Sequence, residues 1–163
     1  MSFVISQKQY LAPTEERIQY EPFIIDDTGF EVEKIDVNFG HPLYTTVADI
    51  FYIKSVREYP QILPIVPDGC MSMVFRNHEG EMSGYICGVI DEIKSHEKFI
   101  FIRFIPGAGY ALIDGGANSI TNKSVSLKDD IPWGEQMLSV LERETELSER
   151  IRLISKQIRV HMR

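Results

Sequence analysis

The pattern of apolar and polar positions divides the chain into a strand-rich body and a helical C-terminal part. Residues 30–39 alternate, with Val37 and Phe39 on one side of the segment and Asp36 and Asn38 on the other, which is typical of a half-buried strand. Short apolar runs bounded by turn residues predict further strands at residues 50–56, 62–66, 70–75, 83–90 and 98–104. Several short strands at roughly even spacing favour a β-sandwich or a β-barrel.

Turn residues refine this prediction at two places. Pro67-Asp68-Gly69 separates residues 62–66 from residues 70–75, and Pro, Asp and Gly each favour a tight turn, so we expect these two strands to form a hairpin. Pro64 removes a backbone donor, which predicts that residues 62–66 form an edge strand. The polar residues 91–97 predict a loop.

The C-terminal part has helical periodicity from Trp133 onward. Apolar residues recur there at steps of three and four, which predicts an amphipathic helix or a pair of helices. Asp129 and Asp130 lie where acidic residues favour a helix start, and Thr145 or Ser148 could cap a second helix. We therefore expect a mainly β, α+β chain, with a barrel or sandwich over residues 1–130 and a helical segment over residues 131–163.

The apolar face of the helical segment suggests a contact surface. Near the chain end this stripe is compatible with either core packing or self-association, so the sequence predicts a homodimer as well as internal helix contacts. The residues that carry this hypothesis are Leu141, Ile151, Ile154 and Ile158.

Composition bounds the class of protein. The chain has 163 residues, 44% of them hydrophobic and 25% charged, which is typical of a soluble globular domain. No apolar run approaches the roughly 20 residues that span a bilayer, so we expect no membrane partner. The N-terminus lacks an export signal, and Cys70 and Cys87 do not form a disulfide scaffold. We therefore expect a cytoplasmic protein.

Charge is unevenly distributed along the chain. Residues 150–163 carry a formal charge of +5, whereas the other 149 residues carry −12, which gives the net charge of −7. An acidic body repels phosphate backbones and is a poor nucleic-acid ligand. The basic end is compatible with a solvated helix end or with a junction to a DNA-binding module.

Arg103 is the sharpest candidate for a specific contact. It interrupts an otherwise apolar strand, residues 99–105, whose two sides are both apolar, and a buried charge requires a partner. The planar guanidinium of arginine suits a carboxylate, which could belong to a protein Asp or Glu or to an acidic effector. The turn at Asp68 and Cys70 could line a ligand pocket beside it, as could strand aromatics such as Tyr85 and Phe101.

Other catalytic and cofactor patterns are absent from the sequence. Gly107-Ala108-Gly109 follows a strand but lacks the third glycine or the Lys-Ser/Thr of phosphate-binding loops, which favours a sharp turn. The four histidines have no metal-ligand spacing, and no nucleophile elbow is present. We therefore expect no catalytic residues, no metal and no cofactor.

Three segments together resemble the N-terminal regulatory domain of AraC-type transcription regulators. They are residues 66–75 (VPDGCMSMVF), residues 103–109 (RFIPGAG), and a third segment with ITN at 120–122, LKD at 127–129 and a Trp133-Gly134 helix start. The resemblance covers roughly residues 50–160. Two positions depart from the family pattern: Ala108 replaces its second glycine, and Asn122 replaces an aspartate.

The resemblance implies a cupin-like barrel that senses a small-molecule effector, followed by a helical dimerisation or linker segment. It implies that DNA is bound only through a helix-turn-helix domain that this chain does not contain. The ligand-binding candidates are then Arg103, Asp68, Tyr85, Cys70 and Phe101. Two alternatives stay open, a small cupin-like enzyme such as an isomerase or dioxygenase, and a stand-alone small-molecule-binding module.

Overall fold

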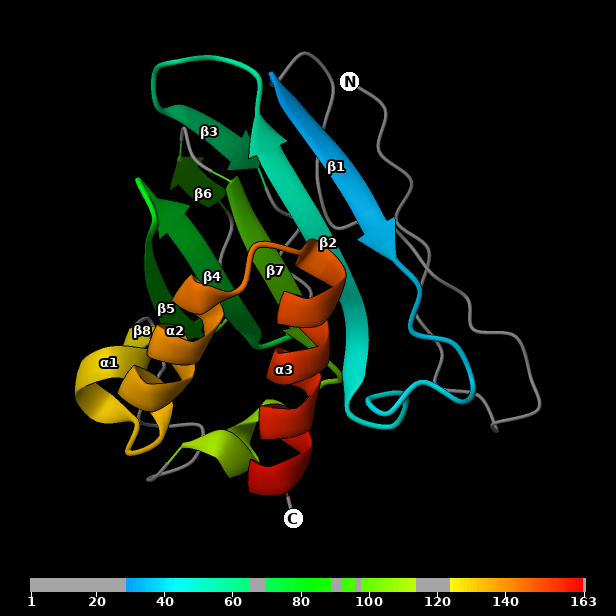
Figure 1. Cartoon of the computed structure of the whole chain (residues 1–163). Coiled ribbons are helices and arrows are strands. Elements are labelled where there is room, and N and C mark those ends of the chain that lie inside the picture. Colours follow the sequence, from blue (N-terminus) through cyan, green and yellow to red (C-terminus); the bar gives the residue numbers. More distant parts are fainter. Residues whose placement is uncertain (1–28, 65–69, 89–91, 96–97, 114–123, 163) are drawn as a thin grey trace.

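The computed structural model describes residues 29–64, 70–88, 92–95, 98–113 and 124–162 of the chain. The strands come first and the helices gather near the C-terminus (Figure 1). The strands are β1 (Phe30–Ile35), β2 (Val47–Ser55), β3 (Gln61–Pro64), β4 (Ser72–His78), β5 (Glu81–Cys87), β6 (Glu92–Ser95), β7 (Lys98–Phe104) and β8 (Ser124–Ser126). The helices are the 3-10 turn η1 (Gly109–Leu112), α1 (Leu127–Asp130), α2 (Gly134–Arg143) and α3 (Leu147–His161).

Six strands form one antiparallel sheet in the order β1-β2-β7-β4-β5-β8, and β3 pairs with β6 in a separate two-stranded sheet. Among the described strands the large sheet is not closed, because its edge strands β1 and β8 pair only with β2 and β5. The prediction of a mainly β body followed by helices is confirmed. The described strands form an open sheet rather than a closed barrel.

Two local predictions about the strands are wrong. The expected hairpin between residues 62–66 and 70–75 does not form, because β3 pairs with β6 and β4 pairs with β5 and β7. Strand β4 is apolar on both sides, so burial favours a central position between two long strands over a pairing with the short β3. Residues 91–97, expected to be a loop, contain β6.

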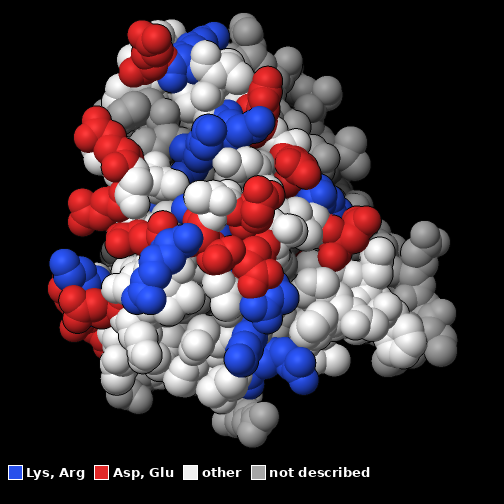
Figure 2. All heavy atoms as spheres, viewed as in Figure 1, with Lys and Arg blue, Asp and Glu red and all other residues white. Residues whose placement is uncertain are grey.

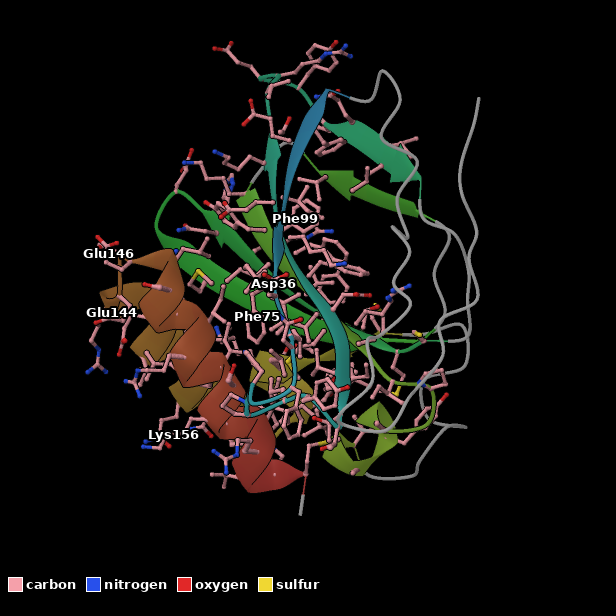
Figure 3. The ribbon with its side chains drawn as sticks, turned by 90° about the vertical axis from the view of Figure 1, so that its right-hand side faces the viewer. Asp36, Phe75, Phe99, Glu144, Glu146 and Lys156 are labelled. Atoms are coloured by element: carbon pink, nitrogen blue, oxygen red, sulfur yellow. The ribbon has the colours of Figure 1, made fainter. Side chains whose placement is uncertain are left out.

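The two faces of the large sheet are both buried, as the apolar sequence of β7 indicates. Ile100, Ile102 and Phe104 belong to the core that α1, α2 and α3 cover. Phe99 and Phe101 belong to a second core on the opposite face. Figure 3 shows the helices on one side of the large sheet and the β3–β6 sheet on the other.

The helical region confirms the predicted helix pair and corrects its caps. Helix α1 begins after Ser126, whose Oγ accepts a hydrogen bond from the Asp129 amide at 3.2 Å. Asp129 and Asp130 lie in this separate one-turn helix, which ends at Asp130, and not at the start of the long helix predicted from Trp133 onward, which is α2 and begins at Gly134. Helix α3 begins after Glu146, so neither Thr145 nor Ser148 is its cap residue.

The two long helices are fastened to each other at both ends. Near their connection, Arg150 Nε donates to the Leu141 carbonyl at 3.2 Å and so satisfies a backbone acceptor at the end of α2. At the other end the Trp133 and His161 rings stack, with centroids 4.4 Å apart and an interplanar angle of 7°. Helices α2 and α3 therefore form one unit on the sheet.

Candidate functional site

Arg103 lies on the face of the sheet opposite the helices, and its partner is a carboxylate of the same chain. Its Nε donates to Asp49 Oδ2 at 2.8 Å, and its Nη2 donates to the same oxygen. The two side chains are 2% and 0% exposed. Arg103 therefore forms an ion pair within the chain. A protein carboxylate was one of the two partners that the sequence left open, the other being an acidic effector.

A β-bulge brings Asp49 to this position. Val47 pairs with Phe104 and Asp49 pairs with Arg103, so strand β2 has one residue more than β7 between these pairs. The extra residue reverses the alternation, which turns Val47 toward the helix-covered core and aligns Asp49 with Arg103. Asp49 was not among the residues predicted from the sequence, although a lone acid inside the apolar stretch 47–53 indicates a buried charge that requires a partner.

Other predicted ligand-binding residues gather on the same face. Register places Phe101 and Tyr85 on either side of Val74, in the row next to that of Arg103. Phe101 is fully buried in the second core, and Tyr85 packs against its edge. These three predicted residues are thus brought together, but as part of a packed layer.

Cys70 and Asp68 complete the predicted set. Cys70 is buried and precedes β4. Asp68 lies outside the described residues, so its place relative to Arg103 stays a prediction. The turn at residues 67–69 lies outside them as well.

Two further polar groups on this face were not singled out by the sequence analysis. Cys87 donates to the Ser72 carbonyl at 3.6 Å, and burial raises the pKa of its thiol to about 12. Arg76 Nη2 donates to the Tyr85 hydroxyl at 3.0 Å, and burial raises the pKa of Tyr85. Burial therefore favours the uncharged forms of the Cys87 thiol and the Tyr85 hydroxyl, so neither is an activated nucleophile.

The four residues predicted for helix or dimer contacts lie in the core of this chain. All four contribute to the cluster between the helices and the sheet, so their side chains make internal contacts rather than an exposed surface. Their exposed fractions are 0% for Leu141, 9% for Ile151, 1% for Ile154 and 0% for Ile158.

Glycines in the motif segments have structural explanations. Gly107 has φ +83°, a conformation that favours glycine, and turns the chain from β7 toward η1, which confirms the predicted sharp turn. A Cβ on Gly134 would collide with the Leu127 carbonyl oxygen, and outside the motif segments a Cβ on Gly84 would collide with Leu127 Cδ1. Leu127 is therefore held between β5 and the start of α2.

A groove lies beside α3, and of the predicted site residues it includes Ile151. Its volume is about 610 Å³, and we call it the α3 groove. Its lining residues are His41, Pro42, Ser148, Ile151, Arg152, Ser155, Lys156, Arg159 and Val160. Smaller cavities lie between α2 and α3 (about 150 Å³) and beside Phe75 and Tyr52 (about 50 Å³).

Two further kinds of feature are absent from the described ranges. There, no group of three or more His, Cys, Asp or Glu side chains is placed to hold a metal ion. Nor does any helix in this part of the chain have the length and apolar character needed to cross a bilayer.

The chain belongs to the family defined by a domain of unknown function (DUF6597), whose model matches residues 40–126. The matched segment runs from the loop after β1 to β8, and it includes the Arg103–Asp49 pair. No curated protein and no solved structure matches the chain.

Proposed function

We propose that this chain is the effector-sensing and dimerisation domain of an AraC-type transcription regulator of the cytoplasm. Its two sheets would correspond to the cupin-like body that the resemblance implies. A ligand held by this body would bias the position of α2 and α3, and with them a helix-turn-helix DNA-binding half of a longer protein. The protein would act as a homodimer and would have no catalytic activity.

The observation that carries the proposal is the attachment of α2 to the sheet by residues of the family-like motifs. Trp133-Gly134 opens α2, and Gly134 lies directly against the Leu127 carbonyl. Leu127 in turn packs over Gly84 of β5. The Met82 amide of β5 also donates to Glu142 Oε1 of α2 at 2.9 Å.

These contacts support a mechanical role for the motif. Because Gly134 leaves no free space beside α1, a displacement of β5 would move α2, and the contacts at both ends of the helix pair would carry α3 with it. The first two motif segments are also neighbours, since Ser72 of β4 pairs with Arg103 of β7. The third motif segment therefore supports the joint between body and helices, which is the part that a sensing domain must keep rigid.

A fusion experiment tests the proposal. The chain is joined to a DNA-binding domain that has lost its own dimerisation domain, and binding to one half-site and to two half-sites is compared. A dimer should bind the paired sites at least about tenfold more tightly, because the second contact is intramolecular. The matched control replaces this chain with a monomeric domain of similar size. Equal affinity for single and paired sites, together with a monomer in sedimentation analysis, would contradict the proposal.

A further inference from the structure

The α3 groove has the size and lining of a small-molecule site. Its volume of about 610 Å³ lies in the range of about 300–1,000 Å³ that is usual for ligand pockets. One wall is α3 and the other is the loop between β1 and β2, which contributes His41 and Pro42. The lining residues of α3 recur at steps of three and four, so they share one side of the helix.

The floor of the groove is partly apolar. Ile151 and Ser155 are 9% and 6% exposed, so they form its deepest part. Pro42 lies opposite, and Val160, which is 48% exposed, lies at the end of the groove. Such a surface would bury the hydrocarbon part of a ligand.

The rim of the groove is basic, although the body of the protein is acidic. Blue side chains gather over the lower half of α3 in Figure 2, and Lys156 projects away from the sheet in Figure 3. The charge of Arg152 is compensated by Glu149, whose Oε2 accepts a hydrogen bond from Arg152 Nε at 2.9 Å. In the ranges that the structure describes, neither Lys156 nor Arg159 forms an ion pair.

The position of these cations favours a shared ligand. Lys156 and Arg159 are three residues apart on a helix, so their Cβ atoms are about 5–6 Å apart and both side chains can reach one anionic group. Attraction to the negative end of α3 explains a cation in its last turn, where Arg159 lies, but not Lys156.

His41 adds a neutral donor on the opposite wall. Its Nδ1 accepts a hydrogen bond from the Leu43 amide at 3.0 Å, so the neutral ring carries its proton on Nε2. Burial lowers the pKa of His41, which favours this neutral form. The groove therefore offers a donor across from the two cations.

We propose that the α3 groove binds a small amphipathic organic anion. Its hydrocarbon part contacts Ile151 and Pro42, and its carboxylate, sulfonate or phosphate group lies between Lys156 and Arg159. The inference goes beyond the proposed function, because it concerns binding by this chain alone and requires neither a dimer nor DNA.

Two fluorescent probes with the same ring system test this inference. Anilinonaphthalenesulfonate is an amphipathic anion, and N-phenylnaphthylamine is its counterpart without the sulfonate. Titration of the chain with each probe should give saturable binding of the sulfonate and at least about tenfold weaker binding of the neutral probe. The variant K156Q/R159Q should weaken sulfonate binding at least about tenfold and leave neutral-probe binding unchanged.

A matched control distinguishes an effect of the groove cations on sulfonate binding from an effect of the net charge. The variant K128Q/R143Q removes two exposed cations outside the groove and changes the total charge by the same amount. It should bind the sulfonate like the unmodified chain. Equal weakening in both double variants, or sulfonate binding that neither variant changes, would overturn the inference.

A second variant tests the groove by shape. Ser148 is an exposed lining residue, so S148W should fill the groove without disturbing the core, which circular dichroism can verify. Loss of sulfonate binding in folded S148W is the expected result. Undiminished binding in folded S148W, or no binding by the unmodified chain, would contradict the proposed site.

Discussion

The two faces of the six-stranded sheet are both buried, yet they are stabilised differently. The face under the helices is a continuous apolar cluster joined to α1, α2 and α3. The opposite face combines aromatic side chains with the Arg103–Asp49 ion pair, the Cys87 thiol and the Arg76–Tyr85 hydrogen bond. Burial alone therefore does not distinguish the two faces; the polar groups do.

The difference has a physical consequence. An apolar face tolerates substitutions that keep its volume, whereas a buried polar group depends on one particular partner. The helix face should respond mainly to changes in packing, and the opposite face to changes in charge and pH. Three experiments test this contrast, from the largest expected effect to the smallest.

Removing one member of the buried ion pair should have the largest effect. Asp49→Asn keeps the shape of the side chain but leaves the Arg103 charge without its carboxylate, so the free energy of unfolding should fall by about 3–5 kcal/mol. Urea denaturation measures this change. The double variant D49L/R103M should recover much of the loss, because an apolar pair of similar volume carries no desolvation penalty.

A surface ion pair provides the matched control. Lys54 Nζ and Glu31 Oε2 are 3.6 Å apart, and the two side chains are 40% and 64% exposed, respectively. Glu31→Gln should change the free energy of unfolding by less than about 1 kcal/mol. If D49N cost no more than E31Q, the contrast between the two faces would be wrong.

On the helix face, Gly134→Ala should lower stability by about 2 kcal/mol, because the new Cβ would collide with the Leu127 carbonyl. Helix propensity alone predicts the opposite sign, a gain of up to about 1 kcal/mol. Thermal or urea unfolding distinguishes the two. Ser139→Ala at an exposed position of α2 is the control and should be nearly neutral. A stabilised G134A variant would show that the close approach does not hold α2.

The third experiment concerns alkaline pH and Cys87. Its pKa is about 12 in the folded protein against 9.0 in the unfolded chain, so above pH 9 the unfolded state binds fewer protons and stability falls as pH rises. The free energy of unfolding is unaffected by this thiol well below pH 9 and is lowered by about 1.4 kcal/mol at pH 10. The Cys87→Ser variant lacks this term, since a serine hydroxyl does not ionise there.

The measurement is the free energy of unfolding of the unmodified chain and of C87S at pH 8 and pH 10. Titrating groups that do not interact with Cys87 contribute equally to both proteins, so their contributions cancel in the difference. Burial raises the pKa of Tyr85 and the charge of Cys87 raises it further, so Tyr85→Phe is introduced into both proteins to remove that contribution. Parallel pH profiles would mean that the thiol is not held in its protonated form by burial.

Much of the fold could be predicted from local patterns. Strand β7 was predicted with its observed bounds, and the helix pair followed from apolar residues at steps of three and four. The pairing partner of β3 could not be predicted, because a four-residue strand such as Gln61–Pro64 carries too little pattern to select a neighbour. The same holds for β6 and β8, which are short and have few apolar residues.

The candidate site shows the same division. The sequence singled out Arg103 because a charge inside an apolar strand requires a partner, and it named a protein carboxylate as one of the alternatives. It could not select Asp49, since a β-bulge between Val47 and Asp49 sets their register. The α3 groove was not predicted at all, because residues more than a hundred positions apart form its two walls.

By itself the sequence determined the mainly β class of the fold, the order of strands and helices, and the position of the buried charge, because hydrophobic periodicity and the cost of burying a charge act locally. Only the tertiary structure decided which carboxylate neutralises Arg103, how closely Gly134 approaches the Leu127 carbonyl, and where a groove of ligand size lies. The ion pair and the groove depend on contacts between distant segments, and the close approach at Gly134 depends on the path of the backbone between α1 and α2, which hydrophobic periodicity does not encode.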